Sequence, residues 1–302
     1  MSIKTYPHNK LIVILGPTAS GKSELSVKLA KKFNGEVISA DSRQIYQEMT
    51  IGTAKVTKRE MDNIPHYMTN IIKPDQEFSL AQFKQKAIKI IKDIQKRDKI
   101  PFLVGGTGLY IQSIVDNLDI PDVKPDKKLR DKLEKLSNQE LLSQLKKLDP
   151  DTANSIDYHN KRRLIRALEV CLITKKPFSK QRKKGKILFN TLQIGINPDK
   201  KILEQRISQR ADKMIKKGLI EEIEKLLTKY KNSLPSLNSI GYAEIIQYLE
   251  KKTSLDQAKN LINRHSLQYA KRQITWFKRD KRIHWIQGQN QAEKLIKDFI
   301  GK

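Results

Sequence analysis

The sequence predicts an α/β fold in which a parallel sheet is wrapped by helices and carries an all-helical insertion domain. Short apolar segments alternate with helical patterns near both ends of the chain, as in parallel sheets that are covered on both faces. A glycine-rich turn directly follows the first apolar segment. Between residues 121 and 186 the strand patterns stop, and a basic helical stretch replaces them. We therefore expect a core of residues 1–120 and 187–302, and a separate helical domain at 121–186.

Four apolar segments are expected to form the buried strands of the sheet. They cover residues 11–15, 36–40, 101–104 and 191–196, and a weaker candidate covers 68–72. Segments this short and this apolar are typical of parallel strands buried on both faces.

Helical spacing and polar capping residues indicate where the helices begin. Residues 22–33 place Leu25, Leu29 and Phe33 on one face, directly after the glycine-rich turn. A helix is also expected at 162–174, and the chain is expected to be helical from Asp199 to its end. Further helix starts are expected at Ser79 (for a helix to about Arg97), at Ser137 with Glu140, at Asp149 before Pro150, and at Ser254 with Gln257.

The composition limits the kinds of protein that this chain can be. It has 302 residues, 60 of them Lys or Arg against 33 Asp or Glu, so the net charge is +27. A charge this positive favours polyanionic partners, although a lysine bias can also reflect genome composition. The single cysteine, Cys171, excludes an intramolecular disulfide and a cysteine-based zinc site. The polar segment Met1–Lys10 lacks the apolar core of a signal peptide, and no apolar run reaches the roughly 20 residues that span a bilayer. We expect a cytoplasmic protein without a membrane anchor.

The glycine-rich turn matches a phosphate-binding motif at every fixed position. Backbone N–H groups of such a loop surround phosphate oxygens, a lysine adds a cation, and a hydroxyl can ligate Mg²⁺. The strand before it and the helix after it are what distinguish this motif from a chance turn. We therefore expect a fold like that of the P-loop NTPases and a phosphorylated substrate, whose phosphate ester the loop does not identify, with Ser23 as the metal ligand. The loop residues, which fit G-x-x-x-x-G-K-[ST], are Gly16, Pro17, Thr18, Ala19, Ser20, Gly21, Lys22 and Ser23.

A carboxylate is expected beside this loop. The third strand ends in Gly105-Gly106-Thr107-Gly108, without the acid that holds Mg²⁺ in ATP-hydrolysing relatives. The acid follows the second strand instead, as Asp41. Because ligands of open parallel sheets bind beyond the carboxyl ends of the strands, Asp41 and Thr107 are both expected next to the phosphate. An Asp at a strand end can also be no more than the cap of the next helix.

Seven blocks of sequence, taken together, resemble the bacterial tRNA dimethylallyltransferases, also called tRNA isopentenyltransferases. The resemblance extends over nearly the whole chain, and the order and separations of the blocks are far more specific than the phosphate loop alone. The blocks are GPTASGKS (16–23), ADSRQIY (40–46), IGTAK (51–55), LVGGTGLYI (103–111), RRLIRALEV (162–170), IGYAE (240–244) and QYAKRQITWFKRD (268–280).

The resemblance implies a prenyl transfer to RNA. The dimethylallyl group of dimethylallyl pyrophosphate moves to N6 of the adenosine directly 3′ of the anticodon (position 37), and pyrophosphate leaves with help from Mg²⁺. The phosphate loop would stabilise the leaving group, and Asp41 is expected to accept the N6 proton as a general base. Thr107 is expected near the same atoms. Arg210 would reach the pyrophosphate, unless it lies on a solvated helix face.

The resemblance also implies tRNA contacts in four parts of the chain. A target base must leave its stack, which costs least in a loop such as the anticodon loop. The expected contacts are Asp41, Ser42, Arg43, Gln44, Arg162, Arg163, Arg166, Asn238, Gly241, Tyr242, Lys271, Arg272, Gln273, Trp276 and Lys278. Lys183, Lys184 and Lys186 are expected to hold the RNA backbone. Trp276 and Phe277 are alternatively core residues of a helix. Departures from the usual family sequence at 157–160, Leu267, Val56 and Ala243 affect individual RNA contacts only.

Two other classes of protein stay open at this point. A P-loop small-molecule or nucleotide kinase shares the fold, but does not need the basic insertion. A nucleic-acid-binding regulatory ATPase leaves Asp41 and the 105–108 turn without a role. We expect a monomer, because no apolar heptad pattern stands out.

Overall fold

The computed structural model describes residues 9–121, 123–181 and 183–301, so most of the polar segment Met1–Lys10 lies outside the described residues. The chain divides into two compact units. One unit is Met1–Ile114 with Leu188–Lys302, and the other is Val115–Ile187. The sequence placed the two boundaries at 120/121 and 186/187.

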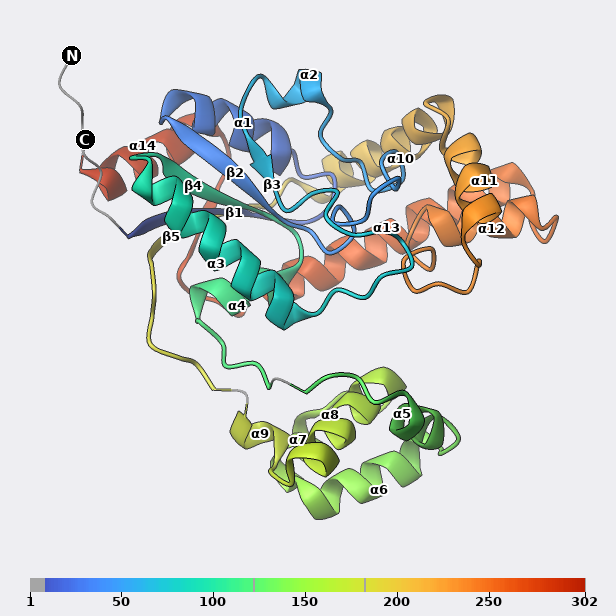
Figure 1. Ribbon diagram of the computed structural model, residues 1–302. Coiled ribbons are helices and arrows are strands. Elements are labelled where there is room, and N and C mark those ends of the chain that lie inside the picture. The colour runs from blue at the N-terminus through green and yellow to red at the C-terminus, as the bar shows by residue number, and fades with distance from the viewer. Residues whose placement is uncertain (1–8, 122, 182, 302) are drawn as a thin grey trace. The chain divides into compact units, whose positions relative to one another are not determined.

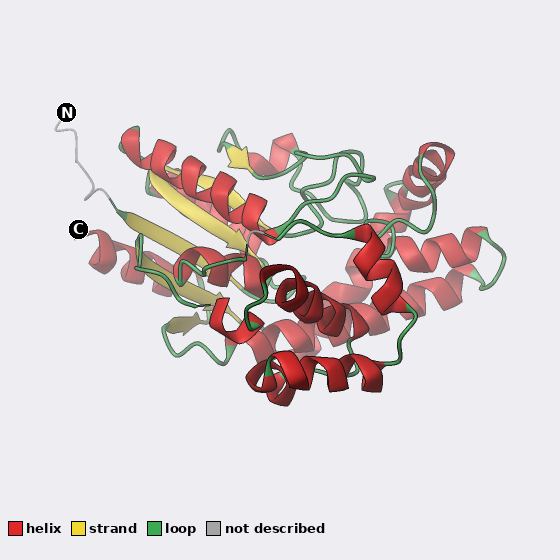
Figure 2. Cartoon of the chain, turned by 60° about the horizontal axis from the view of Figure 1, so that its bottom comes forward, coloured by secondary structure: helices red, strands yellow, loops and turns green. Residues whose placement is uncertain are grey.

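Six parallel strands form one sheet in the first unit (Figures 1 and 2). Their order is β3-β2-β4-β1-β5-β6. The register pairs Leu15 and Ala40 with Gly105, so β1, β2 and β4 end at the same level and at the same edge. The α/β fold and the four main strands expected from the sequence are confirmed. The strands are β1 (Lys10–Leu15), β2 (Gly35–Ala40), β3 (His66–Tyr67), β4 (Ile100–Gly105), β5 (Asn190–Ile196) and β6 (Ile283–Ile286).

One strand prediction was wrong, and one strand, β6, interrupts the segment from Asp199 to the end that was expected to be helical. The segment 68–72 is not a strand, because Met68 and Asn70 have left-handed backbones with φ of 64° and 56°. The short strand β3 lies just before it. The strand β6 was missed, because only its two end residues are buried and its flanks are polar. A short edge strand of this kind carries little apolar signal.

The helices of the first unit cover both faces of the sheet. Buried residues of α1 and α14 form one apolar cluster with β1, β2, β4 and β5. Figure 1 shows α3 across the opposite face. Capping boxes at Ser79 and Ser254 begin α3 and α13, as expected. The helices are α1 (Lys22–Lys32), α2 (Lys58–Met61), α3 (Leu80–Lys96), α4 (Gly108–Val115), α10 (Lys200–Lys216), α11 (Leu219–Lys229), α12 (Tyr242–Leu249), α13 (Leu255–Phe277) and α14 (Gln289–Ile300).

A second apolar cluster of this unit holds the C-terminal helices together. It contains buried residues of α10, α11, α12 and α13, together with Met49 from the segment after β2. This cluster anchors the 50–54 loop to helices that lie far away in the sequence. It therefore sets the distance between the sheet edge and the helices that face it.

The second unit is all-helical, as expected for the insertion. Its core is formed by leucines of α5, α6 and α8 with the buried Cys171. The capping box at Ser137 and the Asp149–Pro150 start are confirmed. One of its buried acidic residues, Glu169, accepts hydrogen bonds from Arg130, Arg166 and the Asp126 backbone. The helices are α5 (Lys127–Glu134), α6 (Asn138–Leu148), α7 (Pro150–Ser155), α8 (Lys161–Thr174) and α9 (Phe178–Gln181).

Across the described residues, no helix is both long and apolar enough to cross a membrane.

Candidate active site

The phosphate loop joins β1 to α1, as the motif predicts. Gly21 directly precedes α1 with φ of +89°, a left-handed conformation that glycine adopts without strain. Lys22 Nζ donates to the Pro17 carbonyl at 3.0 Å. Burial lowers the pKa of Lys22 from 10.5 to about 8, while Asp41 acts to raise the pKa and Arg210 to lower it. An anion bound here would therefore keep the ammonium charged.

Two arginines of α10 approach the loop from the other side. Arg210 Nη1 donates to Thr18 Oγ1 at 3.1 Å, and Arg206 Nη1 donates to the Ser20 carbonyl at 3.3 Å. Burial lowers the pKa of Arg210, and the charge of Asp41 opposes this. The structure thus places Arg210 beside the loop rather than on a solvated face. Arg206 was missed, although its position four residues before Arg210 puts it on the same helical face.

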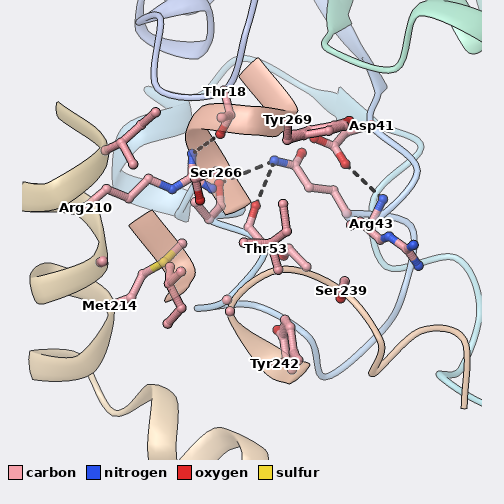
Figure 3. Close-up of a pocket in the computed structure, with 18 of the residues that line it drawn as sticks. Thr18, Asp41, Arg43, Thr53, Arg210, Met214, Ser239, Tyr242, Ser266 and Tyr269 are labelled. Atoms are coloured by element: carbon pink, nitrogen blue, oxygen red, sulfur yellow. Dashed lines mark hydrogen bonds between the residues drawn. The ribbon is translucent and has the colours of Figure 1, made fainter. Parts of the chain in front are cut away.

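Asp41 lies next to Thr107 because β2 and β4 are neighbours in the sheet. Asp41 Oδ1 accepts a hydrogen bond from the Arg43 backbone at 2.9 Å. Thr107 Oγ1 accepts one from the Ser42 backbone at 3.0 Å. Asp41 faces the cavity beside Tyr269 in Figure 3. Burial raises the pKa of Tyr269 to about 12, and Asp41 adds to this effect. Tyr269 is therefore a neutral hydrogen-bonding group at physiological pH.

A cavity of about 380 Å³ joins these groups. Of the phosphate loop, Thr18, Lys22 and Ser23 line it, whereas Thr107 supports the 41–42 turn from outside the lining. The other lining residues expected from the sequence are Asp41, Ser42, Arg43, Gln44, Arg210, Asn238, Gly241, Tyr242, Arg272 and Gln273. Residues predicted from five distant segments of the sequence therefore line one cavity.

The sequence missed several lining residues, among them Thr53, Met214, Ser266 and Tyr269. A helical signal was present on α13, since 262, 266, 269 and 273 are spaced by three or four residues. Without a structure, nothing indicated which face of the helix meets the cavity.

Gln273, expected as a tRNA contact, lines the cavity but is buried and hydrogen-bonded within the protein. The side chain is 6% exposed. Its Oε1 accepts from the Thr18 backbone and its Nε2 donates to the Gly106 carbonyl, both at 2.8 Å. The amide is thus held between the phosphate loop and the glycine-rich turn after β4.

Tyr242 is also withdrawn from solvent. It is 0% exposed, and its hydroxyl donates to Glu222 at 2.7 Å. The same carboxylate accepts from the backbone N–H groups of Thr50, Ile51 and Gly52 at 2.8 to 3.2 Å. Tyr242 thus lines the cavity while its hydroxyl stabilises the 50–52 loop through Glu222, and its contact with tRNA stays a prediction.

Gln44 and Arg166 are both engaged in hydrogen bonds within the protein. The Gln44 amide donates weakly to the carbonyls of Thr53 and Ala54 and accepts from Ser39. Arg166 donates to Glu169 at 2.6 Å and to the Val123 carbonyl at 3.1 Å. These contacts explain structurally why both side chains are only partly exposed.

The remaining tRNA candidates divide by exposure. Trp276 is half-buried and lies over Gly108, where an added Cβ would come within 2.3 Å of the indole ring. Phe277 is buried, as the core alternative predicts. The exposed side chains are Arg162, Arg163, Lys183, Lys184, Lys186, Asn238, Lys271, Arg272 and Lys278. Arg272 also lies over the Tyr269 ring, 5.8 Å from its centre.

Few protein groups are available to hold a metal. Among the residues that the structure describes, no three His, Cys, Asp or Glu side chains form a cluster. Ser23 and Asp41 nevertheless face one cavity. This donor set fits Mg²⁺, which keeps several water ligands and is commonly bound through one or two protein groups plus substrate phosphates.

A phosphate loop on a parallel sheet, with a carboxylate and an arginine facing one cavity, defines a P-loop α/β protein that binds a phosphorylated substrate. The sequence profile described as IPP transferase matches residues 44–280. The chain belongs to this family, which confirms the resemblance and makes the chain an enzyme. A kinase and a regulatory ATPase module are accordingly set aside.

Named relatives cover nearly the whole chain. It is 46% identical to the tRNA dimethylallyltransferase of Carboxydothermus hydrogenoformans, over 96% of both chains. It is 44% identical to that of Staphylococcus haemolyticus, over 96% of this chain and 90% of the relative.

Solved structures agree. The tRNA isopentenylpyrophosphate transferase of Bacillus halodurans is 39% identical, with a TM-score of 0.72 over 97% of this chain and 96% of that one. A eukaryotic dimethylallyltransferase described as acting on tRNA is 34% identical, with a TM-score of 0.77 over 89% of this chain and 69% of that one.

Proposed function

We propose that this enzyme transfers the dimethylallyl group of dimethylallyl pyrophosphate to N6 of the adenosine directly 3′ of the anticodon in tRNA. The observation that carries the proposal is the single cavity shared by Lys22, Arg210 and Asp41. A displacement of this kind needs cations for the leaving pyrophosphate and a base for the incoming amine at the same place.

In this reaction the C1–O bond of the allylic substrate breaks and a bond from N6 to C1 forms. The electron pair of the broken bond leaves with pyrophosphate, whose added charge is stabilised by Lys22, Arg210 and the N-terminus of α1. Asp41 accepts the N6 proton. Its Oδ1 is oriented by the Arg43 backbone, which fixes the carboxylate for this task.

Mg²⁺ held by Ser23 and the pyrophosphate oxygens would neutralise part of the leaving-group charge. The donor set at Ser23 and Asp41 supports this choice of metal, because hard oxygen ligands suit Mg²⁺.

The apolar part of the cavity supports a prenyl substrate. Ala211, Met214 and Ile262 line the wall away from the phosphate loop.

The distribution of charge supports an RNA partner. Exposed Arg272 and Asn238 lie at the cavity itself, and Lys271 and Lys278 lie on the same helix as Arg272 or directly after it. In the helical unit, exposed Arg162 and Arg163 begin α8. Cations in these positions suit phosphate contacts. We also propose that the enzyme is a monomer, because no apolar heptad pattern stands out.

The test is a transfer assay with the full chain. Unmodified tRNA, dimethylallyl pyrophosphate and Mg²⁺ are incubated with the enzyme, and the digested nucleosides are analysed by mass spectrometry. We expect prenylated adenosine that is lost when EDTA replaces Mg²⁺. Matched reactions contain tRNA with guanosine at the target position, or ATP in place of the prenyl donor. Phosphoryl transfer from ATP without prenylation would contradict the proposal.

A further inference from the structure

Along α10, the cavity wall is charged at Arg210 beside the phosphate loop and apolar at Ala211 and Met214, which lie farther from the loop. Ile207, Arg210, Ala211 and Met214 are spaced by three, one and three residues and all line the cavity from one face of the helix. Arg210 contacts Thr18 of the loop. Met214 lies about one helical turn farther along, at about 6 Å from the level of Arg210. Figure 3 shows Met214 beyond Arg210, with its side chain directed into the cavity.

The wall formed by α13 changes in the same direction. Gln273 is bound to the loop, Ser266 lies farther along, and Ile262 lies about 16 Å from the level of Gln273. Met214, Ile262, Ala211 and the buried Tyr242 belong to one apolar cluster. Ile207, nearer the loop, belongs to a different one. Away from the phosphate loop, the cavity is therefore lined by the packed side chains of Met214 and Ile262, which are 8% and 4% exposed.

We infer that Met214, backed by Ile262, restricts the prenyl donor to a single isoprene unit; this inference rests on the proposed function. With the pyrophosphate at Lys22 and Arg210, about one helical turn separates the reacting end of the chain from the Met214 side chain. The main chain of one isoprene unit spans about 5 Å, given carbon–carbon bonds of about 1.5 Å. A second unit would have to enter the volume that Met214 fills, and packed interiors resist such overfilling.

The test is a competition between donors of two lengths. Dimethylallyl and geranyl pyrophosphate are supplied together at equal concentration with unmodified tRNA, and the C5 and C10 adenosine products are quantified by mass spectrometry. The wild type is expected to form the C5 product at least about a hundredfold more efficiently. Met214→Ala is expected to lower that ratio at least about tenfold, whereas Met214→Leu, which conserves volume, keeps it.

A second measurement does not depend on turnover. Binding of geranyl pyrophosphate and of inorganic pyrophosphate is measured by calorimetry without tRNA. Met214→Ala is expected to lower the Kd for geranyl pyrophosphate at least about fivefold, because the prenyl tail contacts residue 214. The Kd for inorganic pyrophosphate, which has no tail, should stay within twofold of wild type. Met214→Val gives a smaller change in the same direction, and serves if the alanine variant does not fold.

The outcomes separate the two ideas. The length restriction alone is overturned if the wild type prenylates tRNA but the folded Met214 variants keep its C5-to-C10 product ratio and its affinity for geranyl pyrophosphate. A wild type that prenylates no tRNA with either donor overturns the proposed function and the inference with it.

Discussion

The carboxamide of Gln273 joins the two glycine-rich turns of the active site, accepting from the Thr18 backbone and donating to the Gly106 carbonyl at 2.8 Å each. Thr18 also accepts a hydrogen bond from Arg210, and Gly106 precedes Thr107. One buried side chain thus holds the leaving-group side of the cavity at a fixed distance from the side that carries the base.

Replacing Gln273 by Leu is therefore expected to impair turnover more than tRNA binding. Loss of both hydrogen bonds frees the two turns to shift, and displacements of about 1 Å at an active site can cost about a hundredfold in rate. We expect kcat to fall about ten- to a hundredfold, with the tRNA Kd within twofold of wild type. The neighbouring exposed Arg272→Ala is the matched control and is expected to weaken tRNA binding. Equal weakening of tRNA binding by both variants would argue that Gln273 contacts RNA directly.

Asp41→Ala is expected to lower turnover far more than it weakens tRNA binding. Removing a general base costs about a hundred- to ten-thousandfold in rate. Single-turnover rates and tRNA Kd values, measured on the same preparation, separate the two effects. Thr107→Val provides the comparison, because Thr107 supports the Ser42 backbone without lining the cavity. We expect its rate loss to be about tenfold at most. If Asp41→Ala reduced rate and affinity to the same extent, Asp41 would be a tRNA-positioning group only.

Pyrophosphate binding is expected to weaken as the pH rises above about 8. Burial lowers the pKa of Lys22 to about 8 in the folded protein, so the free site loses a cation in this range. Inorganic pyrophosphate affinity between pH 7 and 9.5 is the measurement. Lys22→Met is expected to bind pyrophosphate weakly over this whole pH range and to lack the decline. Titration of pyrophosphate itself affects the wild type and the variant equally. Lys55→Met is the control, since burial also lowers the pKa of Lys55 to about 8 but its side chain lies outside the cavity lining. The pyrophosphate affinity of Lys55→Met should still decline at alkaline pH.

The lowered pKa of Lys22 weakens pyrophosphate binding at high pH, but it affects the free energy of unfolding in the opposite direction. Between pH 8 and 10.5 the unfolded state binds more protons at residue 22 than the folded state does. The contribution of Lys22 to the unfolding free energy therefore increases with pH in this window. Weaker ligand binding at high pH cannot then be attributed to unfolding caused by Lys22.

Glu222→Ala is expected to destabilise the first unit by about 2–3 kcal/mol. The change leaves three backbone donors and the Tyr242 hydroxyl without their acceptor. Tyr242→Phe loses one of these bonds and should cost about 1 kcal/mol. Urea unfolding is the measurement, and the exposed neighbour Glu221→Ala should stay within about 0.5 kcal/mol of wild type. A Glu222 variant as stable as the Glu221 control would show that the 50–52 loop is held by other contacts.

The exposed arginines of α8 and the partly exposed, ion-paired Arg166 are expected to behave differently. Arg162→Ala and Arg163→Ala should each weaken tRNA binding and leave stability unchanged. Each should also reduce the slope of log K against log salt concentration by about one. Arg166→Ala should instead destabilise the helical unit, because Glu169 is fully buried and loses a charged partner. Thermal unfolding and salt-dependent tRNA titrations check both. If Arg166→Ala kept wild-type stability and reduced the salt dependence of tRNA binding as much as the Arg162 and Arg163 variants do, Arg166 would be an RNA contact.

The sequence by itself determined the features that depend on short spacing along the chain. The phosphate loop, the caps at Ser79, Ser137 and Ser254, and the four apolar strands are each contained in a few consecutive residues. Parallel strand order then brought Asp41 and Thr107 to the loop, because neighbouring strands end at one edge.

Only the tertiary structure decided how distant polar side chains are used. Gln273 and Thr18 lie 255 residues apart, and no local pattern connects them. Gln273, Tyr242 and Arg166 look like their exposed neighbours in the sequence, but packing places each beside a buried group that needs a hydrogen-bond partner. Burying a polar group without such a partner is costly, so the partners available after folding decide which side chains remain free for a substrate.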